Sequence, residues 1–353
     1  DGQRQFGKMV GSDVLHAAAL EGSAHRAPGI AVEAQAGADA YRFHASVEST
    51  CKISRRRRED FLTQLLQLLL AGVAQGCVYA LVALGFVLIY KATETVNFAQ
   101  GDLMMLGSFF ALTAATVMGL PYWLTIVFAL AVMAVVGMLI ERIVLRPVLG
   151  HPAFTVVMVT IGAGYVMRGV VTMIPGWGTE TYALATPFAD KVIRLGGVIV
   201  AEQQLAVIGH TALLCLGLYL FFRFTRVGIA MQASSQNQLA AYYMGIPVRR
   251  INMLIWGLSA GIATIGGILL APTTFVHSNM GSIRPKASPA APVGGFGRVP
   301  GAIVGGLIIG VVEALAGFYM AEGFKDVAAY VVVLLVLMVK PSGIFGETVA
   351  KKV

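Results

Sequence analysis

The stretch from Thr63 to Tyr90, TQLLQLLLAGVAQGCVYALVALGFVLIY, decides the fold. It contains no charged residue, and it is longer than the roughly 20 mostly apolar residues that a helix needs to cross a bilayer. The buried strands of a soluble parallel sheet, in contrast, are apolar over only about 4–8 residues. The stretch therefore predicts a transmembrane helix and argues against the core strand of a soluble enzyme.

The composition extends this prediction to most of the chain. Of the 353 residues, 57% are hydrophobic and 12% are charged, whereas ordinary soluble domains carry about 25% charged residues. The formal net charge is +8. The basic residues lie at the ends of apolar runs, as Arg55–Arg58 do, which suits contact with lipid headgroups better than binding of nucleic acid. The three cysteines, Cys51, Cys77 and Cys215, lack the spacing of a metal site.

Apolar windows of similar character recur along the chain, beginning with the first one. They are 63–90, 102–120, 122–140, 153–174, 203–222, 252–272, 299–321 and 326–340, of which the last is short. The segment between the sixth and seventh windows, 273–298, is polar and Pro-rich at first and then Gly-rich. We therefore expect an all-α polytopic membrane protein with about eight transmembrane helices and one or two re-entrant or broken segments.

The chain divides into two parts by composition. Residues 1–60 are polar and rich in Ala, Gly and His, without a sustained apolar pattern. We interpret them as an extension, either disordered or upstream sequence translated in error, and assign them no function. Residues 61–353 form the transmembrane domain.

The basic loops predict the orientation of the domain. Arginines in the 141–152 and 223–251 loops place both on the cytoplasmic side. The 175–202 loop, with its β-like VIRLGGVIV run, then faces outward. Counting back through three spans places Phe61 outside, which conflicts with Arg55–Arg58. Either the extension is not native, or the first two apolar segments do not both cross the membrane as simple spans.

Small residues recur four positions apart inside the apolar windows. In a membrane such pairs allow helix backbones to approach closely, which predicts a tightly packed bundle. The pairs are Gly72/Gly76, Gly257/Gly261, Gly301/Gly305 and Gly306/Gly310.

A polar segment, TVNFAQGDLMMLG, follows the first apolar window. Polar groups at membrane depth are costly and usually face a cavity or one another. One interpretation is that Asn97 and Gln100 begin a helix on the substrate path, with Gly101 loosening the backbone. The other is a simple loop and helix N-cap, which we favour for Asp102 and Glu94 because a carboxylate suits the first turn of a helix.

A second candidate for the path is KASPAAPVGGFGRVPG, which begins at Lys286. Its glycines and prolines, Gly294 and Gly295 among them, forbid a regular span and predict a re-entrant loop that lines a cavity. Glu313, inside the seventh window, is a further candidate for the path, and Arg168 in the fourth window is expected to snorkel or to be paired. His210 is expected to be a satisfied or interfacial histidine.

The longest basic loop on the inner side is 225–251, TRVGIAMQASSQNQLAAYYMGIPVRRI. Ala233 to Met244 predicts one short amphipathic helix, which Gly245 and Pro247 end. Held between two spans, this helix could act as a lever for a soluble partner. It could also simply lie in the headgroup layer.

This loop and the span after it, INMLIWGLSAGIATIGGILLAP, resemble the coupling segment of ABC importer permeases. The likeness is to branched-chain amino acid permeases of the LivH type, and it covers about 61–353. Further blocks of the sequence resemble the same permeases and occur in the same order along the chain. They are GFVLIYKATETVNFAQGDLMMLG, ERIVLRPVLG, GGFGRVPGAIVGGLIIGVVEALAGFY and YVVVLLVLMVKPSGIFG.

The resemblance implies a multi-pass subunit of the bacterial inner membrane that forms the path for leucine, isoleucine and valine. Its partners would be a second related permease, two ATP-binding subunits, an external substrate-binding protein and membrane lipid. The chain has no G-x-x-x-x-G-K-[ST] phosphate loop. ATP would therefore be hydrolysed by the partner subunits, and we expect this chain to be no enzyme and to bind no cofactor or metal.

The resemblance also implies where the ATP-binding subunits would dock. The docking residues would be Ala233, Gln236, Asn237, Ala240, Ala241 and Gly245. Relatives often carry an acidic residue near Gln236–Asn237, where this chain has two amides. They also tend to have a smooth short helix where this chain has Ser288, Pro289 and Pro292, so gating here could differ from theirs.

Two alternatives to this function stay open. Within the same family, the substrate could be urea or a short amide. In a different class, the chain could be a secondary transporter or channel that works without an ATPase, and deletion of the 225–251 loop would then matter little. A membrane-embedded enzyme is disfavoured because the sequence shows no paired carboxylates, His cluster or nucleophile–base set.

Overall fold

The computed structural model describes residues 28–178, 180–188, 191–195, 198–283, 290–295, 299–321 and 323–346. By its internal contacts the chain forms two compact units, Asp1–Leu62 and Thr63–Val353. In the first unit, residues from Pro28 onward belong to helix α2 (Pro28–Thr93). A helix was not expected there, because the extension lacks an apolar pattern. The assignment of residues 1–60 as a separate extension stays a prediction.

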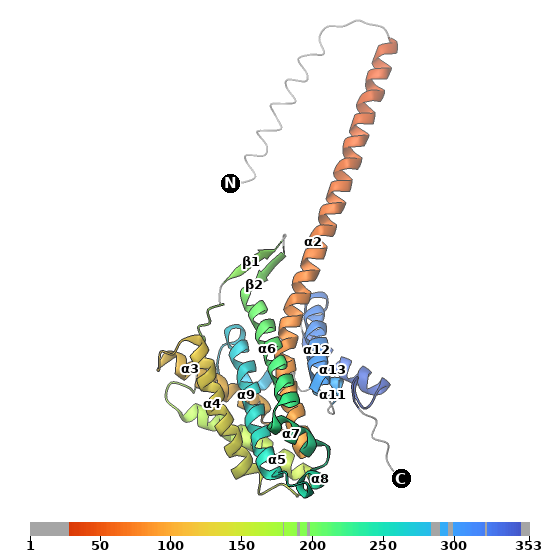
Figure 1. The fold of residues 1–353 in the computed structure, drawn as a ribbon. Helices are drawn as coiled ribbons and strands as arrows, with labels where there is room; N and C mark the ends of the chain where they lie inside the picture. The colour runs from red at the N-terminus through yellow and green to blue at the C-terminus, as the bar shows by residue number, and fades with distance from the viewer. Residues whose placement is uncertain are drawn as a thin grey trace. The chain divides into compact units, whose positions relative to one another are not determined.

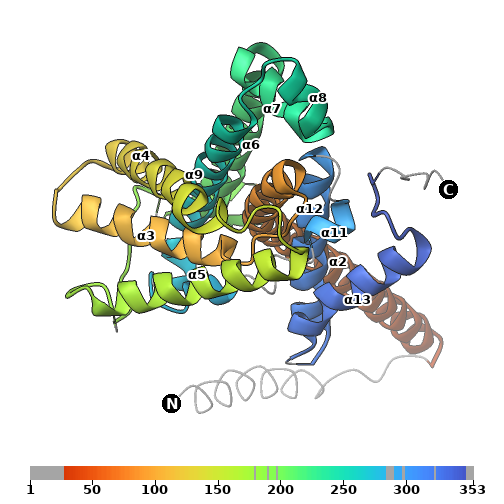
Figure 2. The same cartoon turned by 90° about the horizontal axis from the view of Figure 1, so that it is seen from below.

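The second unit is a bundle of helices (Figures 1 and 2). After the end of α2, its elements are α3 (Gln100–Thr116), α4 (Tyr122–Ile140), a π-helical turn (Glu141–Leu145), α5 (Ala153–Met173), β1 (Val192–Leu195), β2 (Val198–Ala201), α6 (Glu202–Phe224), α7 (Arg226–Gln236), α8 (Gln238–Tyr243), α9 (Val248–Thr274), a 3-10 turn (Met280–Ile283), α11 (Ala290–Gly294), α12 (Val299–Tyr319) and α13 (Phe324–Val339). Every apolar window of the sequence is therefore helical, and the all-α prediction is confirmed.

Six helices within the described residues are long and apolar enough to cross a membrane. They are Phe61–Thr93, Tyr122–Leu145, Phe154–Met173, Glu202–Phe224, Val248–Thr274 and Val299–Tyr319. The other two predicted spans correspond to α3, with 17 residues, and α13, with 16 residues. At about 1.5 Å of rise per residue, both are shorter than a hydrocarbon core of about 30 Å. The six long helices are enough for a multi-pass membrane protein.

The core of the bundle lies around α2 and α9. In the most apolar windows of these helices, 89% and 78% of residues are buried, against 22% for α4 and 17% for α6. The outer helices turn large apolar side chains such as Val127, Tyr165 and Leu213 outward. An apolar exterior of this kind suits lipid or another membrane subunit.

Glycines bring the central helices into backbone contact, as their spacing predicts. A Cβ atom on Gly310 of α12 would lie 2.3 Å from the Cα of Gly76 on α2. On the other side of the core, a Cβ on Gly257 of α9 would lie 2.9 Å from the carbonyl oxygen of Ala134 on α4. The prediction of close helix packing at small residues is confirmed at these positions.

The two ends of the bundle carry different loops. At one end β1 and β2 form an antiparallel hairpin in which Val192 pairs with Ala201, so the β-like run of the sequence is confirmed (Figure 1). Tyr182 of the same loop pairs with Val276, just after α9. At the other end lie α7 and α8 (Figure 1). Which end faces the cytoplasm stays a prediction from the basic loops.

Candidate functional site

The predicted polar site at the start of α3 is a buried hydrogen-bond network. The Asn97 side chain accepts a hydrogen bond from the Ala99 amide at 3.0 Å and donates one to Gln100 Oε1 at 3.4 Å. The Gln100 Nε2 donates to the carbonyl of Ser259 on α9 at 3.4 Å. The Ser259 hydroxyl lies 3.1 Å from Gln100 Oε1 and 3.0 Å from the Gly85 carbonyl, so it can donate to one of them at a time. The network joins α2, α3 and α9.

These side chains are closed off from solvent within the described part of the chain. Asn97 and Gln100 are fully buried, and so is Gly101 beside them. The gap next to Asn97, which Thr160 and Trp256 also line, is too narrow for a water molecule. The network therefore acts here as a packing element between helices, and the path role of Asn97 and Gln100 stays a prediction.

Asp102 has a partner from a distant helix. It lies in the first turn of α3, as expected, but its Oδ1 also accepts a hydrogen bond from Nε of Arg168 on α5 at 2.6 Å. Arg168 is thus paired, which is one of the two arrangements that its place in an apolar window predicted. Pairing is how a membrane protein reduces the cost of a buried charge.

The second predicted path segment is only partly described. Lys286, Ser288 and Pro289 lie outside the described residues. Pro292 lies inside the short helix α11, and Gly295 ends it with a φ of +93°, a value that favours glycine. The chain after α13 holds this turn, because the Phe345 amide donates to the Gly294 carbonyl at 3.1 Å. The break predicted between α9 and α12 is therefore present, and its role in the path stays a prediction.

Glu313 lies on α12 and is buried. Its Oε1 is 3.8 Å from Nζ of Lys325 on α13, and its Oε2 has no hydrogen-bond partner within the described part of the chain. Glu313 is far along the chain from Asn97 and Gln100, and nothing in the described contacts joins it to them. Its assignment to the path stays a prediction.

The predicted coupling helix, Ala233 to Met244, is wrong in its bounds, because the structure has two helices there. α7 ends at Gln236 and α8 begins at Gln238. Between them Asn237 is extended, with φ −156° and ψ 105°, and its Oδ1 accepts a hydrogen bond from the Ala240 amide at 2.9 Å. Asparagine is a strong N-cap, so it begins a new helix instead of continuing the old one. Gly245, with a φ of +81°, follows the end of α8 as predicted.

The α8 segment presents an apolar surface that the sequence analysis missed. Leu239, Tyr242, Tyr243 and Met244 are 70%, 67%, 82% and 83% exposed. A groove of about 670 Å³ is lined by Leu239 and Tyr242 of this surface, and also by Arg249 and Arg250. Of the docking residues inferred from the resemblance, Gln236, Asn237 and Ala240 are exposed, Ala233 is half-buried, and Ala241 is only 4% exposed and packs inward. The signal for the missed residues was the run of three large side chains, YYM, at the end of the predicted helix.

The 225–251 loop also contacts the end of α2. The Gln238 side chain on α8 donates a hydrogen bond to the carbonyl of Ala92, in the last turn of α2. Asn97 and Gln100 follow only a few residues later along the chain. This hydrogen bond thus joins α8 to the helix end that leads into the buried polar network.

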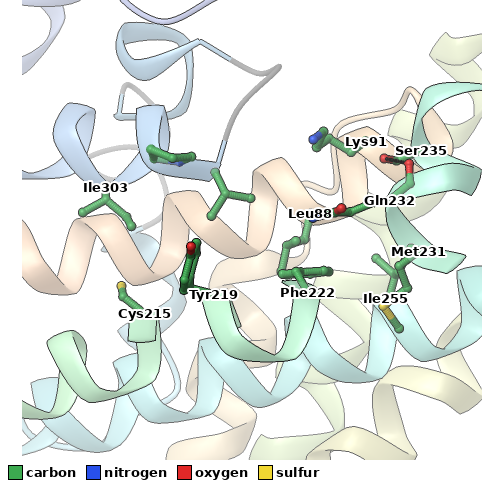
Figure 3. Close-up of a pocket in the computed structure, with 12 residues that line it drawn as sticks. Leu88, Lys91, Cys215, Tyr219, Phe222, Met231, Gln232, Ser235, Ile255 and Ile303 are labelled. Atoms are coloured by element: carbon green, nitrogen blue, oxygen red, sulfur yellow. Dashed lines mark hydrogen bonds between the residues drawn. The ribbon is translucent and has the colours of Figure 1, made fainter. Parts of the chain in front are cut away.

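A cavity lies between α7 and the bundle (Figure 3). Its volume is about 300 Å³. Its walls come from α2, α6, α7, α9 and α12, and are mostly apolar, with Lys91, Gln232 and Ser235 among the lining residues. The sequence could not reveal this cavity, because its walls come from five separated helices.

Comparison with known proteins matches most of the chain to a family of transport permeases. The family described as branched-chain amino acid transport system / permease component matches residues 68–339. The high-affinity branched-chain amino acid transport system permease protein LivH of Escherichia coli K12 is 32% identical over 309 residues, which cover 84% of this chain and 99% of LivH. BraD of Pseudomonas aeruginosa is 30% identical, covering 82% of this chain and 98% of BraD.

A relative from an archaeon is similar over a comparable length. The probable branched-chain amino acid transport permease protein LivH of Methanocaldococcus jannaschii is 30% identical over 283 residues, which cover 75% of this chain and 88% of that protein. These matches agree with the apolar helices of the bundle and with the family resemblance of the sequence blocks. The chain therefore belongs to the family of branched-chain amino acid transport permease components.

Proposed function

We propose that the chain is a transmembrane subunit of an ATP-driven importer for leucine, isoleucine and valine in the bacterial cytoplasmic membrane. It would provide part of the translocation path, and separate subunits would hydrolyse ATP. The names of its relatives support the substrate class. The long apolar helices support a role inside the membrane.

The apolar surface of α8 carries the coupling part of this proposal. A soluble helix rarely exposes contiguous large apolar side chains unless they contact a partner. Tyr242, Tyr243 and Met244 do so at the end of the bundle where the loops are basic. Aromatic residues and methionine are enriched in protein interfaces, and the adjacent groove could receive a partner's side chains. We infer that an ATP-binding subunit docks on α8 and the groove.

Movement could pass from this surface into the bundle by two routes. One is the hydrogen bond from Gln238 to the end of α2. The other is α7, whose Met231 is buried against the core and lines the cavity. A subunit that pulls or pushes α8 would therefore move the walls around the cavity. The remaining partners in the proposal are a second permease, a second ATP-binding subunit and an external substrate-binding protein.

Reconstitution tests the proposal. The chain is placed in liposomes with its second permease, ATP-binding subunits and binding protein, and uptake of labelled leucine is followed with and without ATP. We expect uptake only with ATP and the partners. A variant with Tyr242→Ser and Tyr243→Ser should fail to copurify the ATP-binding subunits, whereas Tyr319→Ser, an exposed tyrosine on α12, should copurify them normally.

Two results would reject the proposal. Leucine transport by the chain alone, without ATP-binding subunits, would identify a secondary transporter or channel. Accumulation of urea and not of leucine by the full complex would keep the ATP-driven mechanism and replace the substrate.

A further inference from the structure

The cavity between α7 and the bundle is lined almost wholly by apolar side chains. They occur at both of its ends in Figure 3, with Ile303 and Cys215 at one end and Met231 and Ile255 at the other. Lys91 is the charged residue among the described lining residues, and it already has an interaction within the protein. The walls therefore suit a hydrocarbon ligand better than a charged one.

The volume of the cavity sets the size of such a ligand. An engineered apolar cavity of about 150 Å³ stays free of water and takes up benzene. At about 300 Å³, the cavity beside α7 can hold the end of one hydrocarbon chain, and not a whole lipid. A chain end in this place would also restore the dispersion contacts that side chains lose beside an empty space.

The cavity opens on a part of the bundle surface that suits lipid. Tyr219 lines the cavity from α6 and is 53% exposed, so the cavity reaches the surface at this side chain. Leu216 and Leu220, before and after Tyr219 in the chain, are exposed as well, and only 17% of the most apolar window of α6 is buried. A membrane helix with such an apolar exterior faces acyl chains, and one of these chains can enter past Tyr219.

A cation lies beside this opening. Arg223, in the last turn of α6, donates a hydrogen bond to the Tyr219 hydroxyl, and its guanidinium carbon is 5.7 Å from the centre of the Tyr219 ring. Arg223 is exposed and has no carboxylate partner within the described part of the chain. A guanidinium has five N–H donors and binds phosphate oxygens in pairs, so donors remain for a phosphate after the bond to Tyr219. The 225–251 loop, which begins two residues later and is predicted to be cytoplasmic, places Arg223 at the depth of the inner headgroups.

We propose that the cavity binds one acyl chain of an anionic phospholipid from the inner leaflet, and that the phosphate of this lipid pairs with Arg223. Basic pockets between membrane helices on the cytoplasmic side are general sites for anionic headgroups. The bound chain would contact Leu88 of α2 and Met231 of α7 together, and so hold the 225–251 loop against the central helix. The site goes beyond the proposed function and does not depend on which substrate is carried.

Photolabelling locates the chain of the lipid. The full-length protein is placed in nanodiscs of phosphatidylcholine with a small fraction of phosphatidylglycerol that carries a diazirine near the end of one acyl chain. After illumination, the labelled residues are identified by mass spectrometry. We expect adducts on the cavity wall, at Leu88 or Phe222, and we expect unlabelled phosphatidylglycerol to displace them. Adducts confined to exposed positions such as Val127 of α4 would overturn the proposal.

Arg223→Gln tests the contact with the headgroup. We expect the cavity adducts to fall at least about fivefold, because one basic residue near an anionic lipid surface contributes a factor of about this size. Arg142→Gln removes an exposed arginine from the other basic loop and should keep the cavity adducts. Equal cavity labelling in the two variants would reject the contact, and with it the proposal. Displacement of the adducts by decanoate and not by phosphatidylglycerol would also reject it, and would assign the cavity to a free fatty acid.

A filled cavity gives a second, independent measurement. Cys215→Phe places a ring in the cavity, whereas Leu213→Phe places one on the exposed face of the same helix. We expect loss of the cavity adducts in Cys215→Phe and their retention in Leu213→Phe, and equal adducts in the two variants would overturn the proposal. Failure of leucine uptake by the full complex, with the cavity adducts unchanged, would reject the proposed function and leave the lipid site in place.

Discussion

Arg168 on α5 and Asp102 on α3 form an ion pair of 2.6 Å inside the bundle, with the Asp102 side chain only 1% exposed and that of Arg168 20% exposed. Two glycines make the space for the carboxylate. A Cβ atom on Gly164 would lie 2.3 Å from Asp102 Oδ2, and one on Gly281 would lie 2.5 Å from Oδ1. The pair therefore joins α3, α5 and the segment after α9 at one point.

Removal of one partner of this pair should destabilise the protein. Arg168→Met leaves the Asp102 carboxylate buried without its cation, which costs about 3–5 kcal/mol in buried pairs. We expect the lower end of this range, because Arg168 is partly exposed, and a fall of several degrees in the unfolding temperature in detergent. Arg142→Met, at an exposed position, should change the free energy of unfolding by less than about 0.5 kcal/mol.

The double variant Asp102→Asn with Arg168→Met separates charge from packing. Removing both charges should recover part of the loss, because neither partner is then left uncompensated. If the double variant unfolds at a lower temperature than Arg168→Met, the ion pair is not the cause of the destabilisation.

The contact of α12 with α2 should tolerate no side chain at Gly310. Gly310→Ala places a Cβ 2.3 Å from both Cα and N of Gly76, which are backbone atoms and cannot rotate away. Such overpacking costs about 1–3 kcal/mol. Gly162→Ala on α5 meets nothing within 4 Å and should be neutral or stabilising by up to about 1 kcal/mol. Thermal unfolding measures both, and equal unfolding temperatures would contradict the close contact.

The cap of α8 should govern docking of the ATP-binding subunits. α8 has only six residues, so it cannot be stable by itself. Asn237→Ala removes the cap at a cost of about 1 kcal/mol. We expect weaker binding of the ATP-binding subunits to the purified permease, measured by titration.

Asn237→Asp is the matched variant for the cap. Aspartate caps a helix as well as asparagine does, and it adds a carboxylate at the exposed start of α8. Binding should therefore be kept or strengthened. Equal weakening by Asn237→Ala and Asn237→Asp would show that the cap is not what matters.

The hydrogen bond from Gln238 to Ala92 should matter for the transmission of movement, and not for the assembly of the complex. Gln238→Ala removes a bond worth about 0.5–1.5 kcal/mol between α8 and the end of α2. We expect the ATP-binding subunits to bind as before, while the amount of leucine taken up per ATP falls. Gln64→Ala, at an exposed position of α2 far along the chain from the 225–251 loop, is the control and should keep this ratio. An unchanged ratio in Gln238→Ala would exclude this route.

Much of the fold could be predicted from local sequence. The apolar windows became helices, and Gly72, Gly76, Gly306 and Gly310 meet where small-residue spacing predicts. The bounds were less well predicted. Asn237 divides the coupling helix because its side chain competes with the next backbone hydrogen bond, and a pattern of apolar residues does not show this competition.

The candidate site was predicted less well than the fold. Asn97 and Gln100 were singled out as candidates for the substrate path, and Asp102 as a carboxylate of a first helical turn. Their partners Ser259 and Arg168 come from other helices and could not be predicted. The cavity was not predicted at all, because it is a space left between five helices and not a property of any one of them.

The sequence by itself determined which segments are apolar helices and which of their positions allow close contact. It could do so because a chain in lipid must satisfy its backbone hydrogen bonds within each segment, so length and local composition are sufficient. Only the tertiary structure decided that Asp102 pairs with Arg168, that Ala241 faces inward while Tyr243 faces outward, and that α7 closes a cavity. These relations depend on how helices pack against one another, which joins residues far apart in the chain.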